Sequence, residues 1–252
     1  MIRLKTEKDL EKLRVSGKIL ASVLKSLSVV AKEGVELREL DELARKLIKE
    51  AGARPAFLGY TPGGGRKPYP AAICTSVNDT IVHGIPTKYK LRKRDILKID
   101  LGVQYEGYFT DSAVTIGIGE VSNIAKKLML VTKEALAAGI ENCRPNGHLG
   151  DIGWAVEKVV KKGGFKAING LTGHGVGFEV HEDPTIYNFG DKGTGVKLKP
   201  GMVLAIEPMV SAGSSDIVQD NDDSYKTADG SLSAHFEHTI AITEDGIEVL
   251  TK

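Results

Sequence analysis

The sequence predicts an α+β fold made of two similar halves that share one core. Helical patterns are followed by strand-like runs, and this order then repeats once along the chain. Nothing in the 252 residues marks a flexible linker or a low-complexity segment, so we expect one domain over 1–252. A chain of this length can bury about 70–75% of its unfolded surface and needs no disulfides to stay folded.

The first half is expected to begin with two amphipathic helices. Residues 6–32 carry leucine and isoleucine at helical spacing, and Thr6 is the expected N-cap. A second helix is expected from about 37 to 51, with Gly52 as its stop signal. Residues 53–80 are rich in proline and glycine, which predicts an irregular loop.

The remaining elements follow from runs of apolar residues, by their spacing and length. The expected elements are, in order, strands over 71–77, 95–103 and 108–118, helices over 122–142 and 149–162, and strands over 202–210 and 235–243.

Charge and cysteine content exclude several classes of protein. Lysine and arginine number 34 against 33 acidic residues, so there is no excess of positive charge for direct nucleic-acid binding. Cys74 and Cys143, the two cysteines, do not form a disulfide framework or a zinc ribbon, and they fit a reducing cytosol. No apolar run is long enough to span a membrane, and the charged N-terminus does not resemble a signal peptide. We therefore expect a cytoplasmic protein without membrane partners.

Four acidic residues lie inside apolar strand-like runs: Asp100, Asp111, Glu207 and Glu237. A buried charge is costly unless it is paired or bound to a metal. A four-residue loop over 104–107 would place the first two acids directly opposite each other in a hairpin, with Cβ atoms about 4.5–5.5 Å apart. Carboxylates this close share a proton or share cations. A single acid of this kind could lie at a solvated strand edge or form a salt bridge, but four together favour a metal site.

Three histidines accompany these acids. His174 and His181 lie in GHGVGFEVHEDP, and His83 lies in IVHGIP. A lone buried histidine is usually a satisfied core residue, but the glycines around His174 allow a close approach of the backbone that a core position does not require. The HExxH spacing is absent, which excludes a thermolysin-like zinc site.

The charges favour two cations over one, because four carboxylates would be balanced by two divalent ions. Oxygen ligands with one imidazole suit manganese, iron, cobalt or zinc. Two such metals can lower the pKa of a water molecule and polarise a carbonyl group. The pattern therefore indicates hydrolytic chemistry.

Four segments, in this order and spacing, resemble the type I methionine aminopeptidases: KIDLGVQYEGYFTDSA, GHGVGFEVHEDP, LAIEPMV and SAHFEHTIAIT. The resemblance covers nearly the whole chain, and VNDTIVHGIP narrows it to this group within the pita-bread metallopeptidases. It implies the pita-bread fold, in which two pseudo-symmetric halves form a central curved antiparallel sheet covered by helices.

The resemblance also implies the metal ligands. Asp100 would bind one metal, Asp111 and Glu237 would bridge both, and His174 and Glu207 would complete the second. The cofactors would be two divalent ions per chain, with cobalt, manganese, iron and zinc as the candidates.

The implied catalytic residues are His83, His181 and Glu207. Glu207 would also shuttle a proton, while the two histidines would contact the substrate peptide without binding metal. A neutral imidazole near the scissile amide can stabilise the developing oxyanion or the departing nitrogen.

The methionine side-chain pocket is implied to include Phe57, Tyr60 and Cys74. Read from the residues alone, Cys74 could equally be a small buried hydrophobe and Tyr60 a loop anchor. The loop over 61–72 is longer than in the common bacterial enzymes of this group.

A tryptophan often found before the SLSA motif is also missing. Asp222, Asp223 and Tyr225 occupy that region instead. Together with the long loop, this substitution bears on the shape of the side-chain pocket and leaves the metal ligands unaffected.

The implied reaction is removal of the initiator methionine from nascent polypeptides when the second residue is small, by metal-activated water. The implied partners are the N-termini of nascent chains near the ribosome, and we expect a monomer. Three alternatives remain at this stage: an Xaa-Pro peptidase of the same fold, a non-catalytic binding protein of that fold, and a glycosidase using two of the carboxylates.

Overall fold

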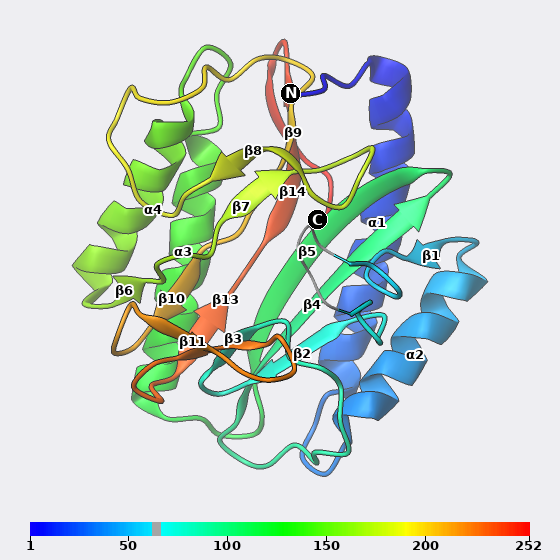
Figure 1. The fold of residues 1–252 in the computed structure, drawn as a ribbon, viewed down its shortest axis with the longest axis vertical. Helices are drawn as coiled ribbons and strands as arrows, with labels where there is room; N and C mark the ends of the chain where they lie inside the picture. The colour runs from blue at the N-terminus through cyan, green and yellow to red at the C-terminus, as the bar shows by residue number, and fades with distance from the viewer. Residues whose placement is uncertain (62–66) are drawn as a thin grey trace.

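The computed structural model describes residues 1–61 and 67–252 and confirms the α+β class (Figure 1). Two pairs of helices flank the strands, with α1 and α2 on one side of the view and α3 and α4 on the other. The helices are α1 (Glu7–Val30), α2 (Leu37–Glu50), α3 (Asn123–Glu141) and α4 (Leu149–Gly163).

The helices agree with the sequence expectations to within about two residues. Thr6 caps α1 as expected, and Asp9 completes a capping box by accepting from the Thr6 amide. Ala51 caps α2, and Gly52 follows with a φ of 72°.

The strands pair in antiparallel fashion in four small sheets. The strands of the first half are β1 (Arg54–Pro55), β2 (Cys74–Val77), β3 (Thr80–Val82), β4 (Ile96–Tyr105) and β5 (Tyr108–Gly117). Those that follow are β6 (Lys166–Ala167), β7 (Gly173–Gly175), β8 (Glu182–Ile186), β9 (Val203–Ile206), β10 (Met209–Ser211), β11 (Ile217–Gln219), β12 (Tyr225–Thr227), β13 (Ser233–His235), β14 (His238–Thr243) and β15 (Gly246–Val249). The strand orders are β1-β4-β2 with β5 on β4, then β13-β10-β6, β11-β12-β3 and β15-β14-β9-β7-β8.

Three expectations about strands were wrong. The run 202–210 divides into β9 and β10, because Pro208 cannot donate a ladder hydrogen bond. The run 235–243 divides between β13 and β14 on either side of Glu237. The segment 53–80 is not loop before residue 71, since it contains β1, while β2 confirms the strand expected over 71–77; residues 62–66 lie outside the described part of the chain.

The hairpin of β4 and β5 also has a different register from the one expected. Glu106 and Gly107 form a two-residue turn with φ angles of 47° and 89°, so Tyr105 pairs with Tyr108. Asp100 therefore faces Ala113, and not Asp111 as predicted. A shift of two residues keeps both acids on the same face of the hairpin, as diagonal neighbours.

Strand β4 separates the core from the site because alternate side chains point to opposite faces. Its odd-numbered residues, from Leu97 to Val103, join the apolar cluster formed by α1 and α2. Its even-numbered residues, among them Lys98 and Asp100, point to the other face and are also buried. The polar face of β4 is thus enclosed by the second half of the molecule.

Lys98 is a fully buried lysine that the sequence analysis did not single out. Its Nζ donates to the carbonyl oxygens of Asn78 at 2.7 Å and Ser233 at 3.1 Å, and to the Ser233 hydroxyl at 3.2 Å. These contacts join the turn between β2 and β3 to strand β13 beneath the site.

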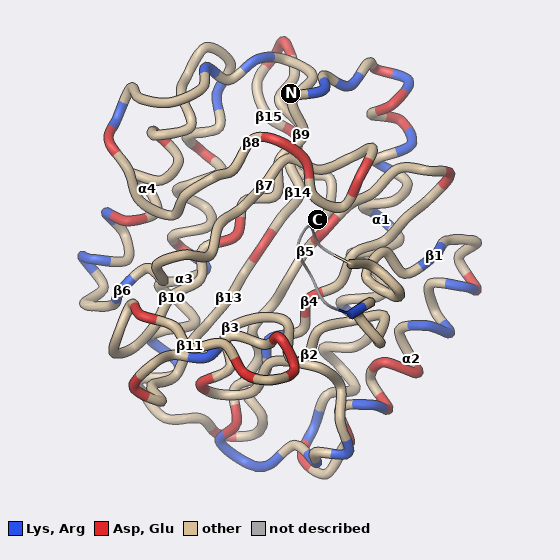
Figure 2. Tube along the Cα trace, in the orientation of Figure 1, with Lys and Arg blue, Asp and Glu red and all other residues tan. Residues whose placement is uncertain are grey.

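Acidic and basic residues are interspersed over the trace (Figure 2). Within residues 1–61 and 67–252, no helix is both long enough and apolar enough to cross a membrane.

Replacing Lys98 with methionine should lower the free energy of unfolding by about 2–4 kcal/mol, because the carbonyl groups of Asn78 and Ser233 lose the buried ammonium that donates to both. Urea unfolding followed by circular dichroism measures the change. The exposed Lys88→Met variant is the control, expected to stay within about 0.5 kcal/mol of the parent. An unchanged midpoint for Lys98→Met would show that the ammonium contacts contribute nothing to stability.

Candidate active site and metal centre

One cavity of about 1510 Å³ is lined by every residue that the sequence analysis assigned to a site. These residues are Phe57, Tyr60, Cys74, His83, Asp100, Asp111, His174, His181, Glu207 and Glu237. They come from both halves of the chain, so the cavity forms only when the halves pack together.

The five expected metal ligands come from five separate elements. Asp100 lies on β4 and Asp111 on β5, while His174 lies on β7. Glu207 follows β9 directly, and Glu237 immediately precedes β14. The breaks in the two long strand-like runs therefore occur at the acids themselves, where the chain leaves the regular ladder.

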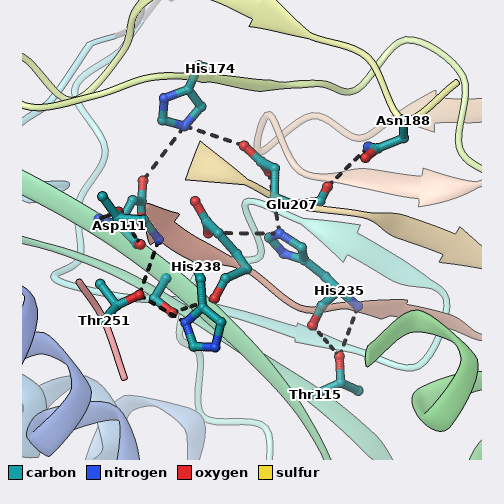
Figure 3. A network of polar contacts seen from close by, with 11 residues as sticks. Asp111, Thr115, His174, Asn188, Glu207, His235, His238 and Thr251 are labelled. Atoms are coloured by element: carbon teal, nitrogen blue, oxygen red, sulfur yellow. Dashed lines mark hydrogen bonds and ion pairs between the residues drawn. The ribbon is translucent and has the colours of Figure 1, made fainter. Parts of the chain in front are cut away.

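His174 points its Nε2 atom at two of the carboxylates (Figure 3). The atom lies 3.4 Å from Glu207 Oε1 and 4.0 Å from Asp111 Oδ2. Its Nδ1 lies 2.9 Å from the carbonyl oxygen of Gly175, to which it can donate a proton. Burial lowers the pKa of His174 to about 4, so the ring is neutral and its Nε2 lone pair is available to a cation.

The carboxylates are buried without enough hydrogen-bond donors. Asp100 Oδ1, Asp111 Oδ1 and Glu237 Oε1 have no partner among the described residues. Burial, and then the neighbouring Asp111, raises the pKa of Asp100, and burial raises that of Asp111 to about 7. Burial followed by the charges of nearby acids likewise raises the pKa of Glu207 and Glu237. Carboxyl groups that have unpaired oxygens and raised pKa values are typical of a site that binds divalent cations.

Two groups of ligand atoms have the spacing of a metal site. Asp111, His174 and Glu237 offer atoms within 4.8 Å of one another, and so do Glu207, His235 and Glu237. Glu237 belongs to both groups. The donor set of oxygens and imidazole suits the metals expected from the sequence.

His235 is the functional candidate that the sequence analysis missed. It is 1% exposed, and its Nε2 lies 3.4 Å from Glu207 Oε2 and 3.9 Å from Glu237 Oε2. Neither ring nitrogen has a hydrogen-bond partner in the described part of the chain. Its backbone is held by Thr115, whose hydroxyl contacts both the His235 amide and carbonyl (Figure 3). His235 lies two residues before Glu237, and side chains two apart in a strand point to the same face, so this spacing could have identified it.

His181 and His83 lie at the cavity wall and take no part in either ligand group. The Nδ1 atom of His181 lies 2.7 Å from the Tyr60 hydroxyl, and its ring contacts His174 edge-on with centroids 4.3 Å apart. His83 has a positive φ of 61° and contacts Tyr225 at 5.7 Å between centroids. Desolvation by the surrounding cavity wall lowers the pKa of both histidines, although each side chain is open to solvent on one side, and it raises the pKa of Tyr60. Both rings are therefore neutral and the phenol keeps its proton.

An apolar pocket adjoins the carboxylates. Phe57, Cys74 and Val180 form a small buried cluster, with Tyr60 and Tyr69 packed against it. Burial raises the pKa of the Cys74 thiol well above its usual range, so it serves as an apolar wall.

The region of the missing tryptophan also lines the cavity. Asp222, Asp223 and Tyr225 all contribute to the wall there, close to His83. The central residues of the long loop, 62–66, lie outside the described residues, and Lys67 is again part of the cavity lining.

The glycines of GHGVG make room for other parts of this chain. A Cβ on Gly173 would lie 2.4 Å from the Ala205 carbonyl oxygen, and one on Gly175 would lie 2.1 Å from that of Asp183. A Cβ on Gly177 would lie 2.4 Å from the Lys5 side chain. The close approach that the sequence indicated is thus to neighbouring strands and to Lys5.

Carboxylates and imidazoles that line one cavity of an α+β scaffold are typical of metallohydrolases, and this site has that character. More particularly, the chain belongs to metallopeptidase family M24, whose family model matches residues 11–244.

Relatives match this chain over its whole length. A methionine aminopeptidase of Aquifex aeolicus is 46% identical, covering 100% of this chain and 99% of its own. The crystal structure of a methionine aminopeptidase from Thermotoga maritima has a TM-score of 0.95 at 44% identity and covers both chains fully. A prolidase from Pyrococcus furiosus has a TM-score of 0.80 at 24% identity, and the match covers 65% of that chain. The pita-bread fold is thereby confirmed.

Asp111→Asn should weaken binding of divalent cations, because a neutral amide replaces a charged carboxylate in the ligand group that Asp111 forms with His174 and Glu237. Titration calorimetry of chelator-treated protein with Mn²⁺ or Co²⁺ gives the affinity and the number of ions bound. Asp216→Asn, an exposed acid outside the cavity, is the matched control and should bind as the parent does. Equal affinity in both variants would contradict the proposed ligand role of Asp111.

Proposed function

We propose that this chain is a methionine aminopeptidase that hydrolyses the peptide bond after an N-terminal methionine when the second residue is small. The observation that carries the proposal is the convergence of Asp100, Asp111, His174, Glu207 and Glu237 in one cavity, with unsatisfied carboxylate oxygens. Full-length similarity to methionine aminopeptidases at 44–46% identity supports the choice of substrate.

We propose that the site holds two divalent cations. Asp100 would bind one, His174 and Glu207 the other, and Asp111 and Glu237 would bind both, since each carboxylate oxygen can hold a different ion. Glu237 belongs to both groups of ligand atoms in the cavity, which supports its bridging role. When bound, such cations lower the pKa of a water molecule and polarise the scissile carbonyl group.

Glu207 is the proposed proton shuttle. Its side chain lies among the other expected ligands, with Oε1 3.4 Å from His174 Nε2 and Oε2 3.4 Å from His235 Nε2. In the reaction its carboxylate accepts a proton from the attacking water and then delivers that proton to the departing amide nitrogen. The amide of Asn188 donates to the Glu207 carbonyl at 3.1 Å and so fixes the backbone of this residue.

His181 and His83 are proposed to bind the peptide and stabilise its developing charge. Because the Tyr60 phenol keeps its proton, it can donate to His181 Nδ1, and the ring then carries its own proton on Nε2. That N–H can donate to the oxygen of the scissile carbonyl as negative charge develops there. His83 lines the same cavity from the turn after β3 and offers a second neutral imidazole.

The methionine side chain is proposed to bind the pocket of Phe57, Tyr60 and Cys74. Its thioether is well suited to pack against aromatic rings. Val180 packs in the same buried cluster as Phe57 and Cys74.

The alternatives account for fewer of these features. Similarity to the prolidase extends to the fold alone at 24% identity. A non-catalytic relative would not need the full ligand set found around the cavity, and a glycosidase would leave the neutral histidines without a role. We further propose that the enzyme acts as a monomer in the cytoplasm, on nascent chains near the ribosome.

Peptides with different second residues test the proposed function. The protein, loaded with Mn²⁺ or Co²⁺, should release methionine from Met-Ala-Ser and leave Met-Ile-Ser nearly intact, because the proposed substrate has a small second residue. Chromatography of the products measures both rates, and Ala-Pro is the control for Xaa-Pro activity. Faster hydrolysis of Ala-Pro than of Met-Ala-Ser would rule out this assignment.

Alanine variants of the two neighbouring histidines separate their roles. His174→Ala should lose part of the bound metal together with activity, because it removes the imidazole ligand. His181→Ala should keep the metal and lower kcat by about 10²–10³, the usual cost of one preorganised donor. Elemental analysis beside steady-state kinetics distinguishes them. If His181→Ala lost a metal while His174→Ala kept both, the two roles would have to be exchanged.

A further inference from the structure

We propose that Lys5 is a positioning residue that holds His181 in its working place through Glu182. The proposal rests on the role of His181 in the proposed function. It concerns the N-terminal segment before α1, which lies beside the start of β8 (Figures 1 and 2).

Lys5 and Glu182 form a buried ion pair between parts of the chain 177 residues apart. Lys5 Nζ lies 2.6 Å from Glu182 Oε2, and the two side chains are 2% and 3% exposed. A buried pair gains little net stability, because both charges lose their hydration. Its value lies in the single geometry that it enforces.

The second oxygen of Glu182 organises the loop that leads to His181. Glu182 Oε1 accepts from the backbone amides of Phe178 at 2.6 Å and Glu179 at 3.0 Å. The carboxylate therefore closes residues 178–182 into a compact turn. His181 lies inside this turn, immediately before Glu182 in the chain. Arg3 Nη2 also lies 3.2 Å from Oε1, while Lys5 is the cation on Oε2 and holds the carboxylate from the buried side.

The fold provides a specific path for the lysine side chain. Lys5 is anchored by its backbone amide, which donates to the Gly201 carbonyl at 2.7 Å. Its aliphatic part crosses Gly177, where a Cβ would lie 2.4 Å from Lys5 Cε. Its ammonium lies 5.0 Å from the centre of the Phe178 ring. Gly177 in GHGVG is thus required for the pair to form.

His181 is thereby held from two directions. Tyr60 binds its Nδ1 atom from the cavity side, and the turn closed by Glu182 fixes its backbone. Loss of Lys5 leaves the tyrosine contact in place but frees the turn. A displacement of about 1 Å in such a group can cost roughly 10²-fold in rate.

The test compares Lys5→Met in the parent and in a His181→Ala background, with Met-Ala-Ser as substrate. In the parent we expect kcat to fall at least tenfold with little change in KM, because the developing charge loses its donor. In the His181→Ala background the same substitution should have almost no further effect. Bound metal should be unchanged throughout.

Hydrogen exchange supplies a readout that is independent of turnover. The amides of Phe178 and Glu179 should exchange faster in Lys5→Met, because their acceptor is no longer held. If the variant proves unstable, Lys5→Met combined with Glu182→Gln removes the buried charge that has lost its lysine partner and should still show the kcat defect. Lys12→Met, which breaks an exposed pair with Glu106, is the matched control and should behave as the parent.

Two results would overturn the proposal: an equal loss of kcat in both backgrounds, or parent-like kcat and amide exchange in Lys5→Met. If the parent released no methionine at all, the proposed function would fail instead, and the exchange of the two amides would still test the link between Lys5 and the turn.

Discussion

The burial of four carboxylates close together, beside the imidazoles of His174 and His235, is the constraint on which the rest of this structure depends. Asp100, Asp111, Glu207 and Glu237 all have raised pKa values, with burial as the first cause. Such a cluster would not persist without a rigid frame and a compensating charge. The strands supply the frame, and three carboxylate oxygens of the cluster have no hydrogen-bond partner among the described residues.

The architecture meets this constraint by giving one strand two buried faces of opposite character. The odd-numbered residues of β4 complete an apolar core under α1 and α2, while the even-numbered residues contribute Lys98 and Asp100 to the interior of the site. The second half covers that polar face with β13 and with the turns around Glu207 and Glu237. The two halves therefore share a polar interior as well as an apolar one.

Around the carboxylates, neutral groups are held in place by contacts that begin far away in the chain. Tyr60 orients His181 from the loop after β1, and Thr115 on β5 fixes the backbone of His235. Lys5 reaches the same region from the segment before α1. Preorganisation of this kind lets imidazoles act as donors without rearranging during the reaction.

By itself, the sequence determined the helices, the two long strands of the hairpin and the acids that meet in the cavity, because periodicity and acids in apolar runs are local signals. Tertiary structure decided the register of Asp100 against Asp111, since a turn of two residues and one of four are both compatible with QYEG. It also decided the roles of His235, Lys98 and Lys5, whose partners lie on other strands or more than a hundred residues away. A charged side chain carries no local mark of burial, and only the packing of the two halves creates the environment that gives these residues a function.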